Sequence, residues 1–124
     1  MKLTNASKGL IILSLAIGSC TYKPEDKLVQ GYWQYEDIKA GDSALISISD
    51  NDIMTLRSDS TFEYHIESVQ KHMYGKWTYS DHTLHLKYNN PDTIRHFSVD
   101  LLSNHQLIMH EGDVTFKFSR IKTD

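Results

Sequence analysis

From Leu28 onward, the chain alternates between apolar and polar side chains in short segments. The segments are rich in β-branched and aromatic residues, and turn-forming clusters separate them at intervals of roughly 8–12 residues, which is typical of β-sandwiches and β-barrels. No segment sustains a helical period over roughly ten residues. We therefore expect strands near residues 29–37, 44–49, 53–58, 61–68, 74–79, 83–88, 93–101, 106–110 and 114–121.

The connections between these expected strands are short and carry turn chemistry, as at residues 58–60 and 111–113. Short connections pair consecutive strands antiparallel, and closing such a meander removes its two exposed edges. The sequence thus predicts an all-β fold, a single antiparallel up-and-down β-barrel of about 8–9 strands.

Alternation along each expected strand also assigns its two faces. In the last strand, Phe116 and Phe118 share a face that Arg120 continues, so this charged side chain needs a partner. Side chains that point into the barrel would either line a ligand cavity or fill a solid core, since both kinds of barrel alternate alike. The candidate ligand-binding residues of the interior are Phe62, Tyr64, Ile66, Trp77, Tyr79, Leu86, Tyr88, Phe97, Val99, Leu107 and Phe116.

The N-terminal segment has a different pattern. Lys2 and Lys8 accompany a short apolar run at residues 10–17, and small residues then precede Cys20. This layout is typical of a secretory signal peptide. It resembles a bacterial lipoprotein precursor, in which the cysteine receives lipid and becomes the first residue of the mature chain. The alternatives are an ordinary cleaved signal and a membrane-spanning helix, which needs about 20 predominantly apolar residues, roughly twice the length of this run.

The lipoprotein resemblance divides the chain into a signal peptide at residues 1–19, a lipidated tether at 20–27 and a β-barrel domain at 28–122. It implies that lipid on Cys20 anchors the protein to a membrane of the cell envelope, which we expect to be the outer membrane. The membrane is therefore one expected partner, and no protein partner is indicated.

The tether resembles the export signal of surface-exposed lipoproteins of Bacteroidota. Lys23, Glu25 and Asp26 are the matching residues, and Pro24 interrupts the pattern. An ordinary solvated linker fits the same residues. The choice between a periplasmic and a surface-facing domain stays open.

Composition restricts the classes of partner further. Without residues 1–19 the chain has about 105 residues, enough for one small domain. The net charge of −3 becomes about −5, because that segment holds two lysines and no acidic residue. An acidic chain without a basic stripe argues against nucleic acid as a partner. Cys20 is the only cysteine, so the domain has no internal disulfide and no thiolate metal site.

Three segments together resemble the lipocalin-like domains of bacterial lipoproteins. They are Gly-Tyr-Trp at residues 31–33, the run at 54–62 that restarts as Thr-Phe after a turn, and Gly-Lys-Trp-Thr-Tyr at 75–79. The chain departs from the family in its shorter length, in Ser60 replacing a turn glycine, and in lacking a disulfide, a Thr-Asp-Tyr motif and a flanking helix. A barrel of eight strands is wide enough either to be filled by side chains or to hold one small ligand, and no more.

The same resemblance gives three residues a structural role. It implies that Trp33 plugs the closed end of the barrel, and that Gly31 lets the strand bend or approach a neighbour. Arg120 of the last strand would lie across the tryptophan as a cation–π partner, worth about 1 kcal/mol. This contact requires both side chains to lie at the same end of the barrel.

Seven histidines raise the question of a metal site or of acid–base catalysis. His82 and His85 form the tightest pair, but residues three apart on a strand point to opposite faces. His65 and His85 alternate out of phase with apolar neighbours, so we expect them to face solvent. No nucleophile elbow or phosphate-binding glycine loop is present in the sequence. We therefore expect no enzymatic activity, no metal and no cofactor.

Two functions are consistent with this sequence. The leading hypothesis is an envelope-anchored lipoprotein that binds a small hydrophobic or amphipathic ligand inside the barrel. The alternative is a non-enzymatic interaction or structural lipoprotein of the envelope, whose barrel is filled by its own side chains. An internal cavity of a few hundred cubic ångströms supports the first hypothesis, and a filled interior supports the second.

Overall fold

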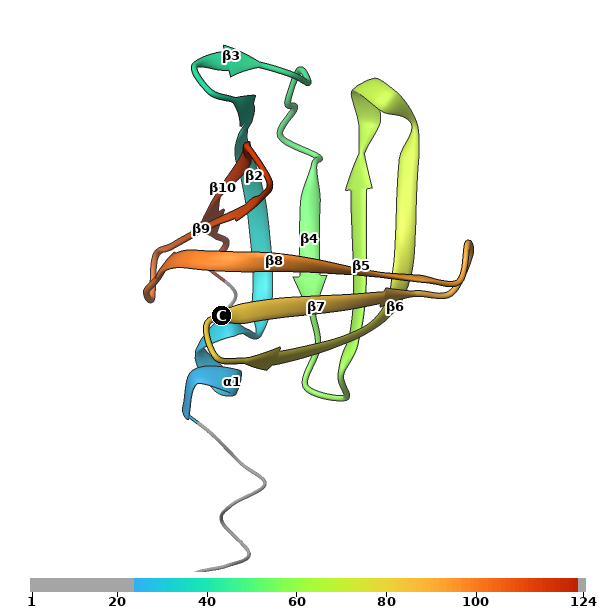
Figure 1. The fold of residues 1–124 in the computed structure, drawn as a ribbon, viewed down its shortest axis with the longest axis vertical. Coiled ribbons are helices and arrows are strands. Elements are labelled where there is room, and N and C mark those ends of the chain that lie inside the picture. The colour runs from blue at the N-terminus through green and yellow to red at the C-terminus, as the bar shows by residue number, and fades with distance from the viewer. Residues whose placement is uncertain (1–23, 123–124) are drawn as a thin grey trace, which may run out of the picture.

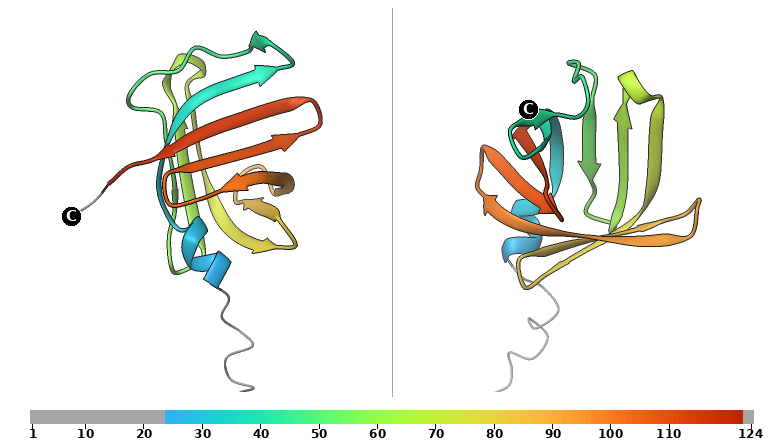
Figure 2. Two further views of the ribbon diagram at one scale, coloured as in Figure 1. Left: turned by 90° about the vertical axis from the view of Figure 1, so that its left-hand side faces the viewer. Right: turned by 45° about the horizontal axis from the view of Figure 1, so that its top comes forward.

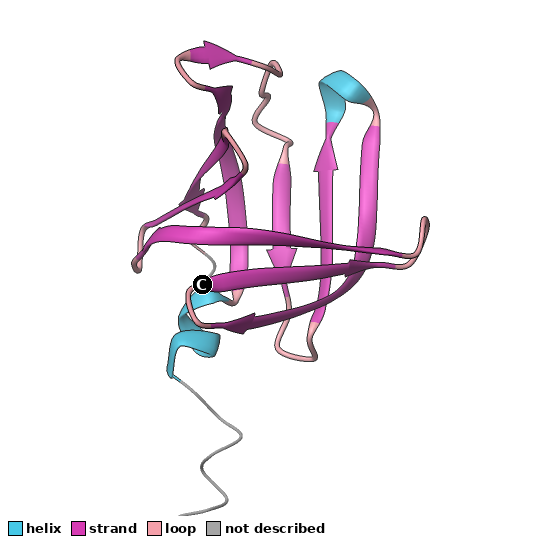
Figure 3. Ribbon diagram, viewed as in Figure 1, coloured by secondary structure: helices cyan, strands magenta, loops and turns pink. Residues whose placement is uncertain are grey.

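The computed structural model describes residues 24–122 (Figures 1 and 3). In chain order the elements are α1 (Pro24–Val29), β2 (Gly31–Ala40), β3 (Ser43–Ala44), β4 (Ile53–Leu56), β5 (Thr61–Ile66), the 3₁₀ turn η3 (Glu67–Val69), β6 (Lys71–Ser80), β7 (Thr83–Tyr88), β8 (Thr93–Leu102), β9 (Gln106–Glu111) and β10 (Val114–Arg120).

Eight of the strands close into an antiparallel barrel (Figure 2). From β4 to β10 each strand pairs with its neighbours in sequence, and β10 returns to pair with β2. The closing register runs from Val114 opposite Ala40 to Arg120 opposite Trp33. The extra strand, β3, pairs with the end of β2. The predicted all-β up-and-down barrel is therefore confirmed.

One expected strand is wrong. Residues 44–49 do not form a strand: β3 covers only Ser43–Ala44, and the chain then runs as a loop to β4. Ile46 and Ile48 in this loop are partly buried against the core. Their β-branched side chains therefore reflect burial under a loop rather than pairing in a sheet.

A second difference lies at the start of the described chain, where the sequence predicts a tether and no flanking helix. Residues 24–29 instead form the short helix α1, and β2 begins at Gly31 rather than at 29. Pro24 opens the helix, and Glu25 and Asp26 lie in its first turn, where a helix favours negative charge. Six residues are too few for a helical period to be visible in the sequence.

The barrel is closed at the end that carries α1 (Figure 1). Trp33 is fully buried there, and its indole Nε1 donates to the carbonyl oxygen of Val29 over 2.9 Å. The Arg120 guanidinium lies over the Trp33 ring, 4.2 Å from the ring centroid. Its Nη1 donates to the carbonyl of Gln30 over 2.7 Å, and its Nη2 donates to the carbonyl of Leu28. The expected contact between Arg120 and Trp33 is therefore present, and it joins the last strand to the helix.

Two glycines allow neighbouring groups to lie close to the backbone of the barrel. Gly31 has φ +130°, and a Cβ there would lie 2.8 Å from Nη1 of Arg120. A Cβ on Gly75 would lie 1.9 Å from the carbonyl oxygen of Lys87 on the neighbouring strand. Gly31 therefore leaves room for the arginine that closes the barrel, and Gly75 lets β6 and β7 come together.

Among residues 24–122, the helices of the structure are all too short to cross a membrane.

The core fills the barrel from the closed end upward. The buried apolar side chains are Val29, Trp33, Tyr35, Ile38, Met54, Leu56, Phe62, Tyr64, Ile66, Trp77, Tyr79, Leu84, Leu86, Tyr88, Phe97, Leu107, Met109 and Phe118.

Candidate ligand-binding site

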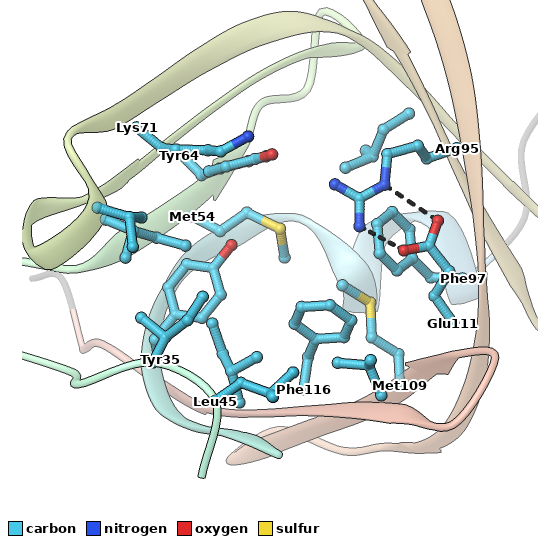
Figure 4. A pocket seen from close by; sticks show the side chains of 16 residues that line it. Tyr35, Leu45, Met54, Tyr64, Lys71, Arg95, Phe97, Met109, Glu111 and Phe116 are labelled. Atoms are coloured by element: carbon cyan, nitrogen blue, oxygen red, sulfur yellow. Dashed lines mark hydrogen bonds and ion pairs between the residues drawn. The ribbon is translucent and has the colours of Figure 1, made fainter. Parts of the chain in front are cut away.

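The half of the barrel away from α1 contains a cavity of about 290 Å³ (Figure 4). Its walls come from β2, β4–β10, the loop after β3, and the η3 turn. The lining residues are Tyr35, Ile38, Leu45, Ile46, Met54, Tyr64, Ile66, Val69, Lys71, Leu86, Arg95, Phe97, Met109, Glu111, Val114 and Phe116.

The structure divides the interior residues expected from the sequence into two groups. The residues that line the cavity are Tyr64, Ile66, Leu86, Phe97 and Phe116. The residues that pack away from it, buried or nearly so in the core, are Phe62, Trp77, Tyr79, Tyr88, Val99 and Leu107. Alternation therefore finds the inward face of the barrel but does not separate cavity wall from core.

An ion pair crosses one side of the cavity. Arg95 on β8 and Glu111 at the end of β9 form a two-pronged contact, in which Arg95 Nε donates to Glu111 Oε2 over 3.0 Å and Nη2 donates to Oε1. These hydrogen bonds raise the pKa of Arg95 and lower the pKa of Glu111. The Arg95 guanidinium also lies 4.9 Å from the ring centroid of Phe97. Both charges are therefore held in place beside an aromatic wall.

Three tyrosines bring hydroxyl groups to the same interior. The hydroxyls of Tyr64 and Tyr88 are 3.0 Å apart, and Arg95 Nη1 donates to the Tyr88 oxygen over 3.4 Å. Tyr35 is 4% exposed, and its ring lies edge-on to Tyr64 with centroids 6.3 Å apart. Burial raises the pKa of Tyr35 well above its ordinary value, and the neighbouring Tyr64 and Tyr88 raise it further. The Tyr35 hydroxyl therefore stays protonated at neutral pH and can donate a hydrogen bond.

Lys71, the first residue of β6, places a second positive charge at the cavity (Figure 4). Along β6 it shares its face with the buried Gly75 and Trp77, while Lys76 faces outward. Lys71 itself is exposed, because the barrel opens at this height.

A buried aspartate fixes the rim of this opening. Asp52 is fully buried, and its carboxylate accepts hydrogen bonds from the Ser49 amide over 2.9 Å, the Ser49 hydroxyl over 3.1 Å and the Glu67 amide over 2.9 Å. It thereby joins the loop after β3 to η3. Leu45 and Val69, from these two segments, are exposed and line the cavity. Asp52 thus holds two apolar rim residues in position.

The sequence analysis missed the charged and rim residues of the cavity. Arg95 and Lys71 have the inward parity of Phe97 and Trp77 on their strands, so the alternation itself contained the signal. The rim residues Leu45 and Val69 lie outside regular strands, where no alternation applies.

The histidines lie on the outside of the barrel. His82 lies in the β6–β7 turn, and His85 contacts His96 across the strands, with their Nδ1 atoms 2.6 Å apart. His72 contacts Glu63 over 2.5 Å. Within residues 24–122, no three histidine, cysteine, aspartate or glutamate side chains gather as a metal site would require.

A model of the lipocalin-like domain family matches residues 29–109. The chain belongs to the lipocalin-like family. A lipocalin-like protein from Bacteroides uniformis ATCC 8492 has a similar structure, with a TM-score of 0.61 and 14% sequence identity over 76% of this chain and 99% of that chain. An uncharacterized protein from Bacteroides eggerthii DSM 20697 gives a TM-score of 0.60 and 12% identity over 74% of this chain and 98% of that chain.

At these identities the two structures establish a shared fold and nothing about the ligand. No curated protein matches the chain. Proteins with a lipocalin-like fold are generally binding proteins without enzymatic activity. For this lipocalin-like protein, the chemistry of binding must therefore be argued from its own cavity.

Proposed function

We propose that this protein is a non-enzymatic lipoprotein of the cell envelope that binds one small hydrophobic or amphipathic ligand inside its barrel. The observation that carries the proposal is the cavity of about 290 Å³ within the barrel. A barrel that served only as a rigid interaction module would gain stability by filling this space, because unfilled apolar volume lowers stability.

The walls of the cavity support an amphipathic occupant. Most of them are apolar, including the side chains of Met54, Phe97 and Met109, and the polar groups are few. Small-molecule sites commonly have this composition, in which buried apolar area provides affinity and a few polar groups fix orientation. The volume lies near the lower limit of about 300 Å³ for such sites, so the ligand is small.

The proposed anchor is lipid on Cys20, which lies outside the described residues. Cys20 precedes α1 by four positions, so the connecting chain spans at most about 14 Å. Because α1 lies at the closed end of the barrel, a membrane-bound cysteine would hold that end near the bilayer. The opening would then face away from the membrane, and the ligand would enter from the aqueous side.

Native mass spectrometry of the protein from its own host tests the proposed ligand binding. We expect a small molecule to remain bound under gentle conditions and to leave when the barrel is denatured. An empty barrel under all gentle conditions, with no small molecule bound on addition, would favour the alternative hypothesis of an interaction or structural protein that binds no small ligand.

The anchor has a separate test. We expect the host-produced chain to start at Cys20, to carry the mass of its acyl chains and to fractionate with membranes. Cys20→Ser should remove both the added mass and the membrane association. A Cys20→Ser protein that is still processed after residue 19 and still bound to membranes would exclude lipid on this residue as the anchor.

A further inference from the structure

We propose that the ligand carries an anionic head group, which Lys71 and the hydroxyls of Tyr64 and Tyr35 hold at the open end of the cavity. This inference rests on the proposed ligand binding and adds the charge of the ligand. Figure 4 shows these three side chains pointing into the same space from β2, β5 and β6.

The first argument is the charge balance of the walls. The charged lining residues are Arg95, Glu111 and Lys71. Arg95 and Glu111 neutralise each other through their paired hydrogen bonds. Within residues 24–122, no carboxylate lies within ion-pair distance of Lys71. The cavity therefore has one positive charge in excess at its open end, which an anionic ligand would pair with and a neutral ligand would leave to solvent.

The second argument is the direction of the hydroxyl protons. The Tyr88 oxygen accepts a hydrogen bond from Arg95 and lies 3.0 Å from the Tyr64 oxygen, and either hydroxyl of this pair can be the donor. When Tyr88 donates to Tyr64, the Tyr64 proton is free to donate to a ligand. In Figure 4 the Tyr64 hydroxyl points into the cavity beside the Lys71 amine. The space between them faces two donors, and it favours a group that only accepts.

The third argument is a hydroxyl that faces the cavity and has no protein partner. Tyr35 is 4% exposed, and its hydroxyl points into the cavity. In the part of the chain that the structure describes, no side chain or carbonyl forms a hydrogen bond with this hydroxyl. The hydroxyl oxygen is accessible from the cavity, so a ligand atom that accepts from Tyr35 can replace water there.

The remaining wall accommodates the apolar part of the same ligand. Met54, Met109, Phe116 and the rim residue Leu45 line other parts of the cavity with apolar side chains (Figure 4). A volume of about 290 Å³ holds roughly ten non-hydrogen atoms, at about 30 Å³ for each atom of the size of a water molecule. Octanoate has this size and combines an alkyl chain with a carboxylate.

The test compares three probes with one alkyl chain and different head groups: octanoate, octanol and octylamine. Isothermal titration calorimetry at pH 7 uses the unlipidated Cys20→Ser protein, purified without detergent because a detergent monomer is itself an amphipathic ligand. We expect octanoate to bind roughly tenfold more tightly than octanol, since it gains charge-assisted hydrogen bonds, and octylamine to bind most weakly. Added salt should weaken octanoate binding and leave octanol binding unchanged.

Two variants locate the head group. Lys71→Met should remove the preference for octanoate and leave octanol affinity unchanged. Lys76→Met, on the outer face of the same strand, is the matched control and should behave like the native protein. Tyr35→Phe should lower octanoate affinity a few-fold and octanol affinity by less, because a donor to a carboxylate is lost in the first case and a donor to a neutral hydroxyl in the second. This variant keeps the aromatic ring and provides the test if Lys71→Met does not fold.

The outcomes separate the two proposals. Equal binding of octanoate and octanol by the native protein would overturn the anionic head group and leave ligand binding intact. Retention of the preference in both Lys71→Met and Tyr35→Phe would overturn the assigned position. Failure of all three probes to bind would overturn both proposals, whereas octanoate binding that Lys71→Met abolishes supports both.

Discussion

The contact that closes the barrel makes a quantitative prediction about stability. Replacing Arg120 by methionine keeps most of the apolar stem and removes the guanidinium. That group lies 4.2 Å from the ring centroid of Trp33. It donates to the carbonyls of Gln30 and Asn104, over 2.7 Å in each case, and to the carbonyl of Leu28.

The cost of Arg120→Met follows from these contacts. Each charge-assisted hydrogen bond is worth about 1.5–3 kcal/mol when buried, and we take about 0.5–1 kcal/mol here because the guanidinium is partly hydrated. The cation–π contact contributes about 0.5–1 kcal/mol more. We therefore expect Arg120→Met to lower the free energy of unfolding by about 3 kcal/mol, which corresponds to roughly 12–24 °C in the melting temperature of a domain of this size.

Urea and thermal unfolding, followed by tryptophan fluorescence and circular dichroism, measure this difference. Arg57→Met is the matched control, because among residues 24–122 the Arg57 guanidinium pairs only with the half-exposed Glu63, over 2.7 Å. The control should cost less than about 1 kcal/mol. Equal losses for Arg120→Met and Arg57→Met would refute the view that the arginine joins α1 to the barrel.

Three further predictions concern the cavity and the sheet. Arg95 lowers the pKa of Glu111, so the native protein should be more stable than Glu111→Gln by about 1 kcal/mol at pH 7. This difference in the free energy of unfolding should disappear as the pH falls below about 4.5, where Glu111 is protonated. Urea unfolding that gives the same difference at pH 7 and at pH 3 contradicts this prediction. Gly75→Ala places a Cβ 1.9 Å from a backbone oxygen of β7 and should cost about 3 kcal/mol by thermal unfolding. The control for Gly75→Ala is Gly112→Ala, whose Cβ meets nothing within 4 Å and which should cost only about 1 kcal/mol for its φ of +62°. Asp52→Ala should lower the free energy of unfolding by about 2–3 kcal/mol and speed amide exchange in η3 and in the loop after β3. Unchanged exchange in these two segments would exclude the role of Asp52 at the rim.

The barrel could be predicted from the sequence because two independent signals agree along most of the chain. Strand alternation places Phe62 and Phe97 on the inner face, and polar turn clusters set short antiparallel connections. The predicted helix content was wrong at α1, since the six residues of Pro24–Val29 are held by packing rather than by a periodic pattern. The buried Val29 and the indole that binds its carbonyl both come from tertiary structure.

The charged residues of the cavity show a different limit. Charge in a strand is usually typical of a solvated face, so Arg95 and Lys71 are easily assigned to the outside even though their parity is inward. The side chain that makes Arg95 tolerable inside is Glu111, which lies on the next strand and 16 positions away in sequence. Alternation identifies an inward charge, but only the pairing of β8 with β9 identifies its partner.

Height along the barrel axis decides which inward residues become cavity wall and which become core. The register places Arg120 opposite Trp33 at the closed end, and Val114 opposite Ala40 at the open end. Inward residues level with the first pair are covered by the tryptophan and by α1. Those level with the second have only the loop after β3 and η3 above them, so the same alternation encloses a cavity there. Because register is set by turns and by bulges such as the one between Lys117 and Phe118, a residue's height emerges only when the whole ring is closed.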